Sequence, residues 1–418
     1  MALLRPEERL VSGFKGMEKS DDDYFRQVSA SLKAAQVCQP TLIIDRKRLD
    51  HNIEAVKAVL SRGLNLRIVV KSLPSSPLLS YLMEKTGTER LMCFHIPFVL
   101  EVARLFPFSS ILLGKPMPVE AVNWFYGQLK KHGSGFSPET NLQWLIDSFE
   151  RLEEYEALAE ALGVTMQVNL EINVGLERGG FCTSRFEEFH KALSFIKSSP
   201  HLRLSGLMGY EVFIVHLPSI ICTKEAAFAA ARAKYQVFRS HVEEMYAPDE
   251  VAQMTFNTGG SNTYSLYEDA VPANEISLAS AFVQPEDFDR NTLAHHKPAA
   301  FIAAPILKVM NKPKLPMVPK LSALMRIVGR LPQKSCFIYG GNWLATPCFP
   351  KGISRSKAFG HSSNQEMYDL PANSGVKVND FLFFRPAQSE AVFLQFGDIA
   401  VFDGSEITEY WPVLRQNH

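Results

Sequence analysis

A lysine ends an apolar stretch of the sequence, Leu66–Lys71. Apolar surroundings lower the pKa of a lysine and leave a neutral amine that can form a Schiff base. If the stretch is a strand of a parallel barrel, its last residue lies at the face where barrel enzymes keep their active sites. The simpler interpretation is a lysine that only reaches water at the end of a strand. Lys71 is therefore a candidate catalytic residue.

A turn of small and polar residues follows the apolar residues 254–256. It reads Asn257-Thr258-Gly259-Gly260-Ser261. Small residues allow backbone N–H groups and hydroxyls to approach an anion, and the start of a following short helix adds a favourable dipole. Phosphate sites in barrels are often found after the seventh and eighth strands. The turn is a candidate phosphate site, although most Gly-Gly turns are only turns.

A third motif, Glu171–Gly180, places polar residues in and after an apolar strand. Glu171 and Asn173 are two residues apart and so share one face of a strand, and Arg178 lies in the loop that follows. Polar side chains inside a barrel are costly to bury without partners. They indicate a polar site, with a structural salt bridge between Glu171 and Arg178 as the alternative.

The elements that must position these residues alternate regularly along the chain. Short apolar, β-branched segments are each followed by a segment of helical periodicity, such as Leu49–Arg62, Phe149–Leu162 or Lys224–Tyr246. The expected strands are Thr41–Arg46, Leu66–Ser72, Arg90–His95, Ser109–Lys115, Leu142–Ser148, Thr165–Val174, Arg203–Glu211, Gln253–Gly260 and Glu275–Val283. This pattern predicts an α/β fold, a (β/α)₈ TIM barrel. No G-x-G-x-x-G motif follows the first strand, which disfavours a dinucleotide-binding sheet.

The composition divides the chain into three parts. Residues 1–40 are polar and loosely helical, with acidic residues at 21–23 that could cap a short helix, and are expected to form an N-terminal arm. The barrel is expected over residues 41–291. Residues 292–418 are rich in proline and in short β segments, such as Phe301–Val309, and predict a C-terminal all-β domain.

In this order and spacing, the motifs resemble those of the fold-type III pyridoxal phosphate enzymes, the group that contains alanine racemase, D-threonine aldolase and D-serine dehydratase. The resemblance extends from about Pro40 to the C-terminus, and the branch that it favours is that of D-threonine aldolase and D-serine dehydratase. The matching segments are Leu49–Ile53, Lys71, Glu171–Gly180, Leu207–Glu211, Thr258–Ser261 and Glu275–Phe282.

The resemblance implies a role for each matching residue. Lys71 would carry pyridoxal 5'-phosphate, Arg178 would lie near the pyridine oxygen and Tyr210 would line the cofactor pocket. Thr258, Gly259, Gly260 and Ser261 would cradle the phosphate. Glu171 and Asn257 complete the set of expected cofactor-binding residues.

The sequence departs from the branch near its C-terminus. Aldolases and dehydratases of this branch carry a His-x-Cys or His-x-Asp pair that holds a divalent ion against the substrate hydroxyl. Here Gln388 and Glu390 stand at the matching place. Oxygen donors are poor zinc ligands but could suit Mg²⁺, Mn²⁺ or Ca²⁺. The two residues are candidate metal ligands, and absence of a metal is the alternative.

Three residues are candidates for the catalytic base. His95 ends the strand next to that of Lys71, and a barrel-core histidine is its simpler interpretation. His361 lies in a polar loop and could act as a base or as a third metal ligand, since imidazole titrates near neutrality. Tyr339 lies in the β-domain, the region from which alanine racemase brings a tyrosine across its dimer.

Composition limits the classes of partner. The 418 residues include 44 basic and 44 acidic residues, so no long-range field gathers polyanions, and neither nucleic acid nor an acidic membrane is expected as a partner. The longest apolar run, Val212–Cys222, is too short to cross a bilayer. The N-terminus is unlike a secretory signal, and six cysteines without a CxxC pair suit a reducing cytoplasm.

The expected function is that of a pyridoxal phosphate-dependent lyase that cleaves or forms the Cα–Cβ bond of a β-hydroxy D-amino acid, with Mg²⁺ or Mn²⁺ as a second cofactor if a metal is present. A racemase or a dehydratase would use the same Lys71 and Arg178. A non-catalytic cofactor carrier is disfavoured, because such carriers resemble the barrel alone. Related two-domain enzymes form head-to-tail dimers, so a homodimer is expected.

Overall fold

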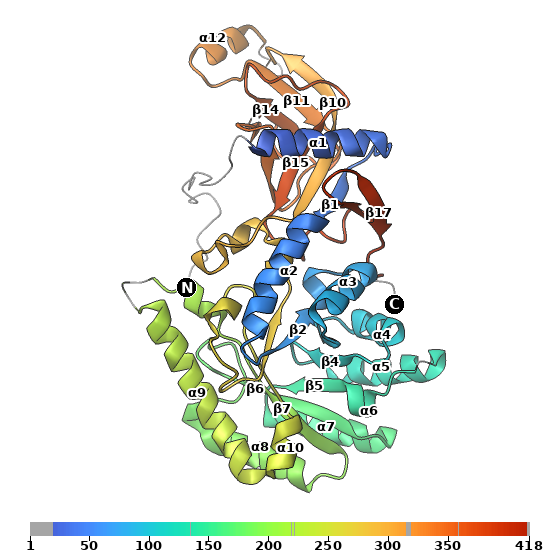
Figure 1. Cartoon of the computed structure of the whole chain (residues 1–418), viewed down its shortest axis with the longest axis vertical. Helices are drawn as coiled ribbons and strands as arrows, with labels where there is room; N and C mark the ends of the chain where they lie inside the picture. Colours follow the sequence, from blue (N-terminus) through green and yellow to red (C-terminus); the bar gives the residue numbers. More distant parts are fainter. Residues whose placement is uncertain are drawn as a thin grey trace.

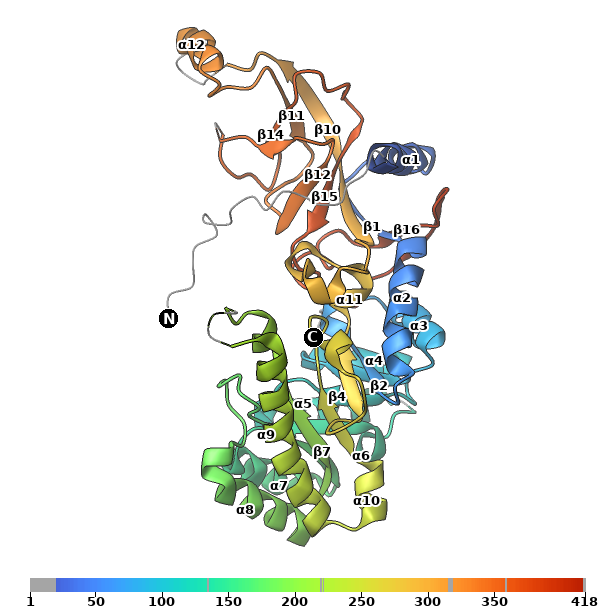
Figure 2. The ribbon, with the colours of Figure 1, turned by 60° about the vertical axis from the view of Figure 1, so that its left-hand side comes forward.

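The computed structural model describes residues 20–415 except 134, 219, 221, 315–318 and 358. The molecule is elongated, with a barrel surrounded by helices at one end of its long axis and a twisted sheet at the other (Figure 1). The view turned by 60° shows the same separation (Figure 2).

A closed barrel of eight parallel strands forms the first body. Its strands are β2 (Asn65–Val69), β3 (Arg90–Cys93), β4 (Ser110–Leu113), β5 (Leu142–Ile146), β6 (Met166–Ile172), β7 (Leu202–Gly209), β8 (Thr255–Thr258) and β9 (Glu275–Leu278). Most of their residues are buried, because the interior of the barrel covers one face and the helices cover the other. The predicted TIM barrel is confirmed, and β9 closes it by pairing with β2.

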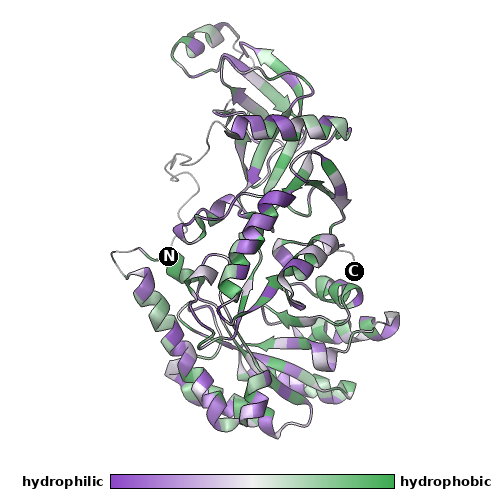
Figure 3. Ribbon diagram, viewed as in Figure 1, coloured by the Kyte–Doolittle hydropathy of each residue, from purple (hydrophilic) through white to green (hydrophobic). Residues whose placement is uncertain are grey.

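Helices surround the barrel strands. They are α2 (Arg46–Leu60), α3 (Ser76–Thr86), α4 (Ile96–Leu105), α5 (Val119–His132), α6 (Pro138–Asn141), α7 (Phe149–Leu162), α8 (Phe186–Ser198), α9 (Lys224–Met245), α10 (Pro248–Gln253) and α11 (Ser280–Val283). In α9, buried Ala231, Tyr235 and Phe238 recur at helical spacing. Figure 3 shows hydrophilic and hydrophobic residues alternating along these helices. Among the described residues, no helix is long and apolar enough to cross a membrane.

The second body is a mainly antiparallel sheet. Its strands are β1 (Thr41–Asp45), β10 (Ala300–Asn311), β11 (Lys334–Ile338), β12 (Ala345–Phe349), β13 (Ser354–Arg355), β14 (Met367–Leu370), β15 (Phe381–Pro386), β16 (Ile399–Phe402) and β17 (Ile407–Trp411). Their order is β13-β14-β11-β10-β1-β16-β17, and β15 pairs with β10 and β12. A short helix, α12 (Ser322–Ile327), lies between β10 and β11 in sequence. The predicted β-domain is confirmed.

One expected barrel strand belongs to this sheet instead. Thr41–Arg46 was expected to begin the barrel, but Ile43 of β1 pairs with Phe301 of β10 and with Ala400 of β16. A continuous apolar segment indicates a buried strand but not the sheet that the strand joins. Both sheets of this protein contain apolar strands that are fully buried, so the pattern of β1 fits either of them. The first barrel strand is therefore β2, and β1 and α2 connect the two bodies.

The segment before β1 is partly a packed helix, α1 (Ser20–Ala34). Three acidic residues, 21–23, lie in its first turn, where they interact favourably with the helix dipole. Its apolar residues Phe25, Val28 and Leu32 are buried in a cluster with residues of the sheet. The short helix that the acidic residues 21–23 were expected to begin is thus present and packs on the sheet, and residues 1–19 of the expected arm lie outside the described residues.

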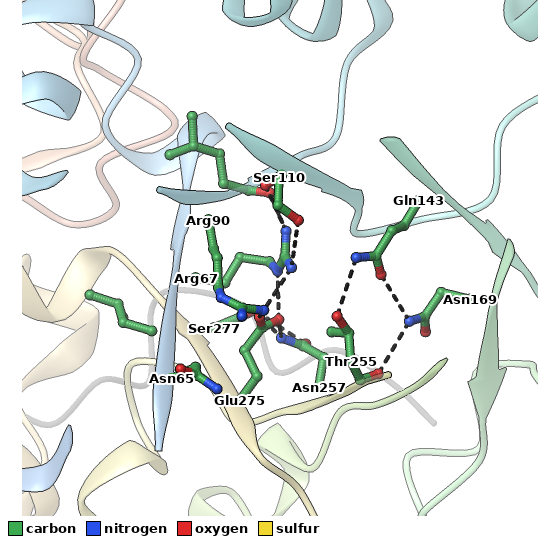
Figure 4. A network of polar contacts seen from close by, with 12 residues as sticks. Asn65, Arg67, Arg90, Ser110, Gln143, Asn169, Thr255, Asn257, Glu275 and Ser277 are labelled. Carbon is green, nitrogen blue, oxygen red and sulfur yellow. Dashed lines mark hydrogen bonds and ion pairs between the residues drawn. The ribbon is translucent and has the colours of Figure 1, made fainter. Parts of the chain in front are cut away.

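Polar side chains occupy much of the barrel interior (Figure 4). Arg67 and Glu275 are both fully buried and pair through two contacts, Nε to Oε1 at 2.5 Å and Nη2 to Oε2 at 3.0 Å. Arg90 and Asn257 add hydrogen bonds to the same carboxylate at 3.0 and 2.7 Å. A buried charge needs such partners to offset its desolvation. The network joins β2, β3, β8 and β9 across the site where the barrel closes.

Candidate active site

Lys71 lies at the mouth of the barrel, in a 3₁₀ turn (Val70–Ser72) directly after β2. Its Nζ lies 4.6 Å from the ring centroid of Phe94 and 3.5 Å from Oε1 of Glu390. The side chain is 42% exposed, so its surroundings are partly polar and not apolar as expected. The amine is accessible to a ligand and lies between an aromatic ring and a carboxylate.

Glu390 reaches Lys71 from the other body, in the segment that follows β15. The hydroxyl of Ser72, which is 3% exposed, donates a hydrogen bond of 3.0 Å to Oε1 of Glu390. This bond fixes the carboxylate beside the amine. A carboxylate in this position can accept a proton from the amine or from a group bound next to it.

The turn after β8 lies at the same end of the barrel, because all eight strands run parallel. Gly259 has a φ of +79°, a left-handed conformation that glycine adopts without strain. None of the hydrogen bonds among the described residues is donated by the backbone N–H of Gly260, Ser261 or Asn262. These residues are buried, and a buried N–H without an acceptor costs free energy. A bound anion would satisfy the three groups.

A buried carboxylate that sequence reasoning missed shapes this turn. Glu211 is 1% exposed and accepts hydrogen bonds from Oγ1 of Thr258 at 2.8 Å, from the backbone N–H of Gly259 at 3.1 Å and from Oγ1 of Thr263 at 2.6 Å. The expected phosphate contacts of Thr258 and Gly259 are thus already committed to Glu211. The donors left for an anion lie further along the turn.

Ser261 is placed differently from Thr258. Its Oγ accepts hydrogen bonds from the backbone N–H groups of Ala279 at 3.3 Å and Ala281 at 3.0 Å. A hydroxyl oxygen that accepts two bonds still has its own proton to donate. Ser261 therefore links the turn to the segment after β9 and can donate to a bound anion.

Tyr210 and Arg178 lie beside the turn. A Cβ on Gly260 would lie 2.9 Å from the ring of Tyr210, and the guanidinium of Arg178 lies 5.9 Å from the centroid of that ring. Burial raises the pKa of Tyr210 to about 12, with the carboxylates of Glu211 and Glu390 adding to the rise. The phenol is therefore neutral at pH 7. Burial also raises the pKa of Glu171, an effect that Arg178 opposes.

Asn257 does not join the turn. Its Nδ2 donates to Oε1 of Glu275 at 2.7 Å and to Oγ of Ser277 at 2.8 Å inside the barrel (Figure 4). Successive residues of a strand point to opposite sides, and Thr258 takes the other side. The expectation that the Asn257 side chain binds the cofactor is therefore corrected: it belongs to the interior network.

Of the three candidate bases, His95 is the one that lies on the barrel, between β3 and α4. The ring that meets Lys71 is that of Phe94, the preceding residue. The backbone is extended at His95, so the side chains of Phe94 and His95 point to opposite sides. The centroid of the His95 ring lies 5.3 Å from that of Phe98 in α4.

The other two candidate bases lie in the sheet. Nδ1 of His361 lies 3.3 Å from Oε1 of Glu366, and Tyr339 is 45% exposed at the end of β11. The contacts described for these two residues all lie within the sheet body. Within this chain, Glu390 and not His361 or Tyr339 meets the lysine.

Gln388 and Glu390 do not form the expected pair of metal ligands. Nε2 of Gln388 donates to Oδ2 of Asp287 at 2.8 Å, whereas Glu390 contacts Lys71 and Ser72. Over the described ranges of the chain, no three His, Cys, Asp or Glu side chains are grouped so as to hold an ion. Hard cations need several oxygen ligands directed at one point. The residues at this place do not fit Mg²⁺ or Mn²⁺.

A cavity of about 960 Å³ opens at the opposite end of the barrel. Its lining includes the first residues of several strands, such as Asn65, Arg90 and Thr255, and none of the residues predicted to bind cofactor or metal. Barrel enzymes place their chemistry at the C-terminal ends of the strands, which is the end that holds Lys71.

A parallel eight-stranded barrel joined to a mainly antiparallel sheet is the fold-type III architecture. The family model for the N-terminal domain of alanine racemase matches residues 44–276, more than half of the chain. The chain therefore belongs to the alanine racemase N-terminal domain family. No curated protein matches the sequence at a significant level.

Solved structures of several enzymes share the whole fold. A D-threonine aldolase from Filomicrobium marinum is 15% identical with a TM-score of 0.69, over 90% of this chain and 97% of that one. A D-threo-3-hydroxyaspartate dehydratase from Delftia sp. HT23 is 13% identical with a TM-score of 0.70, over 91% of this chain and 98% of that one. An alanine racemase from Clostridium difficile 630 is 13% identical with a TM-score of 0.65, over 90% of this chain and 98% of that one. At such low identities the likeness shows the fold alone.

Three residues of the site were missed or given another role by sequence reasoning. Glu211 was seen only as the end of a strand, although an acidic residue at the end of an apolar strand is itself a signal. Ser72 follows Lys71 directly but was not predicted to be a residue of the site. Glu390 was expected to bind a metal, and its contact with Lys71 depends on how the two bodies pack.

Proposed function

We propose that the chain is a pyridoxal 5'-phosphate-dependent enzyme that acts on a small D-amino acid at the barrel mouth. The observation that carries this proposal is the joint placement, at the C-terminal ends of the barrel strands, of an accessible lysine and a turn with unused backbone donors. The cofactor has an aldehyde that reacts with an amine and a phosphate that such donors bind. Both halves of the cofactor therefore have a partner.

The residues of the site fit the cofactor group by group. Lys71 would hold it covalently, and the N–H groups of Gly260–Asn262 with the hydroxyl of Ser261 would bind its phosphate. Tyr210 would line the ring, and Arg178 would approach the pyridine oxygen. When bound, the cofactor withdraws electrons from the bond to Cα that breaks.

We further propose that the reaction is the cleavage, or in reverse the formation, of the Cα–Cβ bond of a β-hydroxy D-amino acid. In the resembled branch, the residue at the place of Glu390 holds an ion against the substrate hydroxyl. In this chain, Glu390 would remove the hydroxyl proton as the bond breaks and an aldehyde departs. Lys71 would then supply the proton that the remaining Cα requires, so that glycine is the second product.

Glu390 would therefore do the work that a metal does in the resembled branch. Its carboxylate is held by Ser72 and lies 3.5 Å from the amine, whereas Gln388 is turned toward Asp287. We expect a chelator to leave turnover unchanged. Turnover that is lost on chelation and restored by Mg²⁺ or Mn²⁺ would contradict this assignment.

Racemisation or dehydration of a D-amino acid is the second candidate. Both reactions use Lys71 to move the Cα proton. The mismatch of Gln388 and Glu390 with a metal site favours racemisation in particular, because a racemase needs no ion against a substrate hydroxyl. In dehydration, Glu390 would give a proton to the departing hydroxyl instead of taking one.

Proton NMR of the cofactor-loaded protein in heavy water separates these reactions. D-threonine, D-serine and D-alanine are supplied in turn, with and without Mg²⁺ or Mn²⁺. We expect D-threonine to give acetaldehyde and glycine without added metal. Deuterium at Cα without cleavage would indicate a racemase, and a 2-oxo acid a dehydratase.

The Lys71→Ala variant is the background control. We expect it to lose both turnover and the visible absorbance of lysine-bound cofactor. Persistence of that absorbance would remove Lys71 from the scheme. Wild-type protein that binds the cofactor but leaves a wide panel of D-amino acids unchanged would instead favour a non-catalytic carrier.

A further inference from the structure

The neutral chain separates its charges along the sequence. Between Asp289 and Glu366 there is no acidic residue, while twelve lysines and arginines occur there. Because basic and acidic residues are equal in number over the whole chain, the remainder carries an excess of twelve acidic residues. A net charge of zero therefore conceals a strongly basic segment, which extends from before β10 to the strand β14.

Part of this basic segment forms the end of the molecule that lies farthest from the barrel. Helix α12 and the adjoining ends of β10 and β11 lie there in both views (Figures 1 and 2). We call residues 308–314 and 319–334 the basic tip. Its charged residues are Lys308, Lys312, Lys314, Lys320, Arg326, Arg330 and Lys334. They lie before, within and after the short helix α12 in the sequence, and several residues of this helix and its flanks are exposed.

The same tip exposes a group of large apolar side chains. Leu321, Leu324, Ile327 and Val328 are 44%, 55%, 82% and 59% exposed and come from one turn of 3₁₀ helix and the helix that follows it. Figure 3 shows the apolar colour on this helix. A soluble protein rarely exposes a contiguous apolar group without a partner for it.

Two basic residues hold the tip in shape instead of remaining free. Arg326 donates to the backbone carbonyls of Pro313 and Pro332, and Nζ of Lys334 donates to the carbonyls of Ser374 at 2.6 Å and Val376 at 3.1 Å. Arg326 thereby fastens the helix to the segments that join it to β10 and β11, and Lys334 fastens β11 to the segment after β14. Its apolar side chains are presented by a fixed support.

We propose that the basic tip docks the protein on an anionic lipid surface. Exposed lysines and arginines are attracted to anionic headgroups, and aliphatic side chains beside them can enter the boundary of the acyl chains. Nucleic acid would use the charges but not the aliphatic side chains, since its contacts are made with phosphates and base edges. The tip also lies at the end of the molecule that is farthest from the barrel, so docking there leaves the Lys71 mouth clear (Figures 1 and 2).

Vesicle co-sedimentation of the full chain tests the proposal. Vesicles of phosphatidylcholine alone are compared with vesicles that also contain phosphatidylglycerol. We expect binding only to the anionic vesicles and weaker binding as salt is raised. Lys320→Gln with Arg330→Gln should weaken binding about fivefold for each charge removed. Leu324→Ser with Ile327→Ser should weaken it about tenfold or more.

Matched changes on the barrel serve as controls, because they alter equally exposed side chains elsewhere. Phe108→Ser, at a residue that is 80% exposed, and Lys85→Gln with Lys131→Gln should leave vesicle binding unchanged. Equal vesicle binding by the Leu324→Ser, Ile327→Ser variant would overturn the proposal. So would binding of a DNA fragment in place of vesicles, or a change in the solution mass of that variant, which would make the tip a contact with a second copy.

Discussion

Among the individual residues, Glu390 has the contacts that bear most directly on the proposed chemistry. It leaves the sheet body to meet Lys71, and Ser72 orients it. A carboxylate is an acceptor when ionised and a donor when protonated, so one residue can serve cleavage or dehydration. The lysine alone does not distinguish these reactions.

Replacing Glu390 by glutamine tests its role while keeping the shape of the side chain. We expect kcat to fall by about 10²–10⁴-fold, the usual contribution of a general base. The visible absorbance of bound cofactor should remain, in contrast to Lys71→Ala. Gln388→Ala, which changes a neighbour directed at Asp287, should have a much smaller effect on kcat. Full activity of Glu390→Gln would remove the carboxylate from the mechanism.

A second residue gives the protein a defined sensitivity to acid. His296 is buried, and its Nε2 is hydrogen-bonded to the hydroxyl of Tyr264, which follows the turn after β8. Burial lowers the pKa of His296 to about 4, from 6.5 in an exposed chain. Between these two values the unfolded chain binds more protons than the folded one, so acidification favours unfolding.

The free energy of unfolding therefore does not depend on His296 above pH 6.5, and it decreases as the pH falls from 6.5 toward 4. The change amounts to about 3 kcal/mol of unfolding free energy. Urea unfolding at several pH values measures it, and His296→Gln should be less sensitive to pH over this interval. An identical pH dependence of the variant and the wild type would show that other groups are responsible.

At the level of elements, the barrel is closed by polar as well as apolar contacts. Glu275 of β9 binds Arg67 of β2 and Arg90 of β3, and Asn257 of β8 adds a fourth strand (Figure 4). This layer lies inside the barrel, on strands whose other ends carry Lys71 and the turn after β8. Its integrity therefore fixes the relative positions of those two parts of the site.

Removing the central carboxylate should be costly, because Arg67 would remain fully buried without its partner. We expect Glu275→Ala to lower the unfolding free energy by about 3–5 kcal/mol. Arg90→Ala removes a side chain that is 39% exposed and should cost about 1 kcal/mol or less. Equal losses of stability in the two variants, measured by chemical unfolding, would argue against a burial effect.

At the level of the whole molecule, we propose that the protein is a homodimer, as its resemblance to two-domain enzymes implies. The exposed Tyr339 and Leu344, on a sheet body that reaches beyond its own barrel, are compatible with a contact to a second copy. Light scattering should give twice the 46.9 kDa of one chain. A mass of one chain would contradict the proposal and would leave the barrel mouth to be completed by Glu390 of the same chain alone.

Local sequence patterns predicted the barrel and two parts of the candidate site. Alternation of apolar strands with amphipathic helices predicted the barrel, because burial on both faces of a strand and on one face of a helix leaves a periodic trace. The end of an apolar strand marked Lys71, and small residues marked the turn after β8. These features depend on residues close together in the sequence, and so the sequence by itself predicted them.

Only the tertiary structure decided which distant residues meet. The apolar pattern indicates that β1 is buried but not that it joins the sheet. Likewise, whether the side chain of Asn257 points into the barrel or toward the turn depends on how its strand is placed in the barrel. Glu390 meets Ser72 from 318 residues away, because the sheet body packs over the barrel mouth. A motif cannot record such a contact, since it depends on the packing of elements that are separate in the sequence.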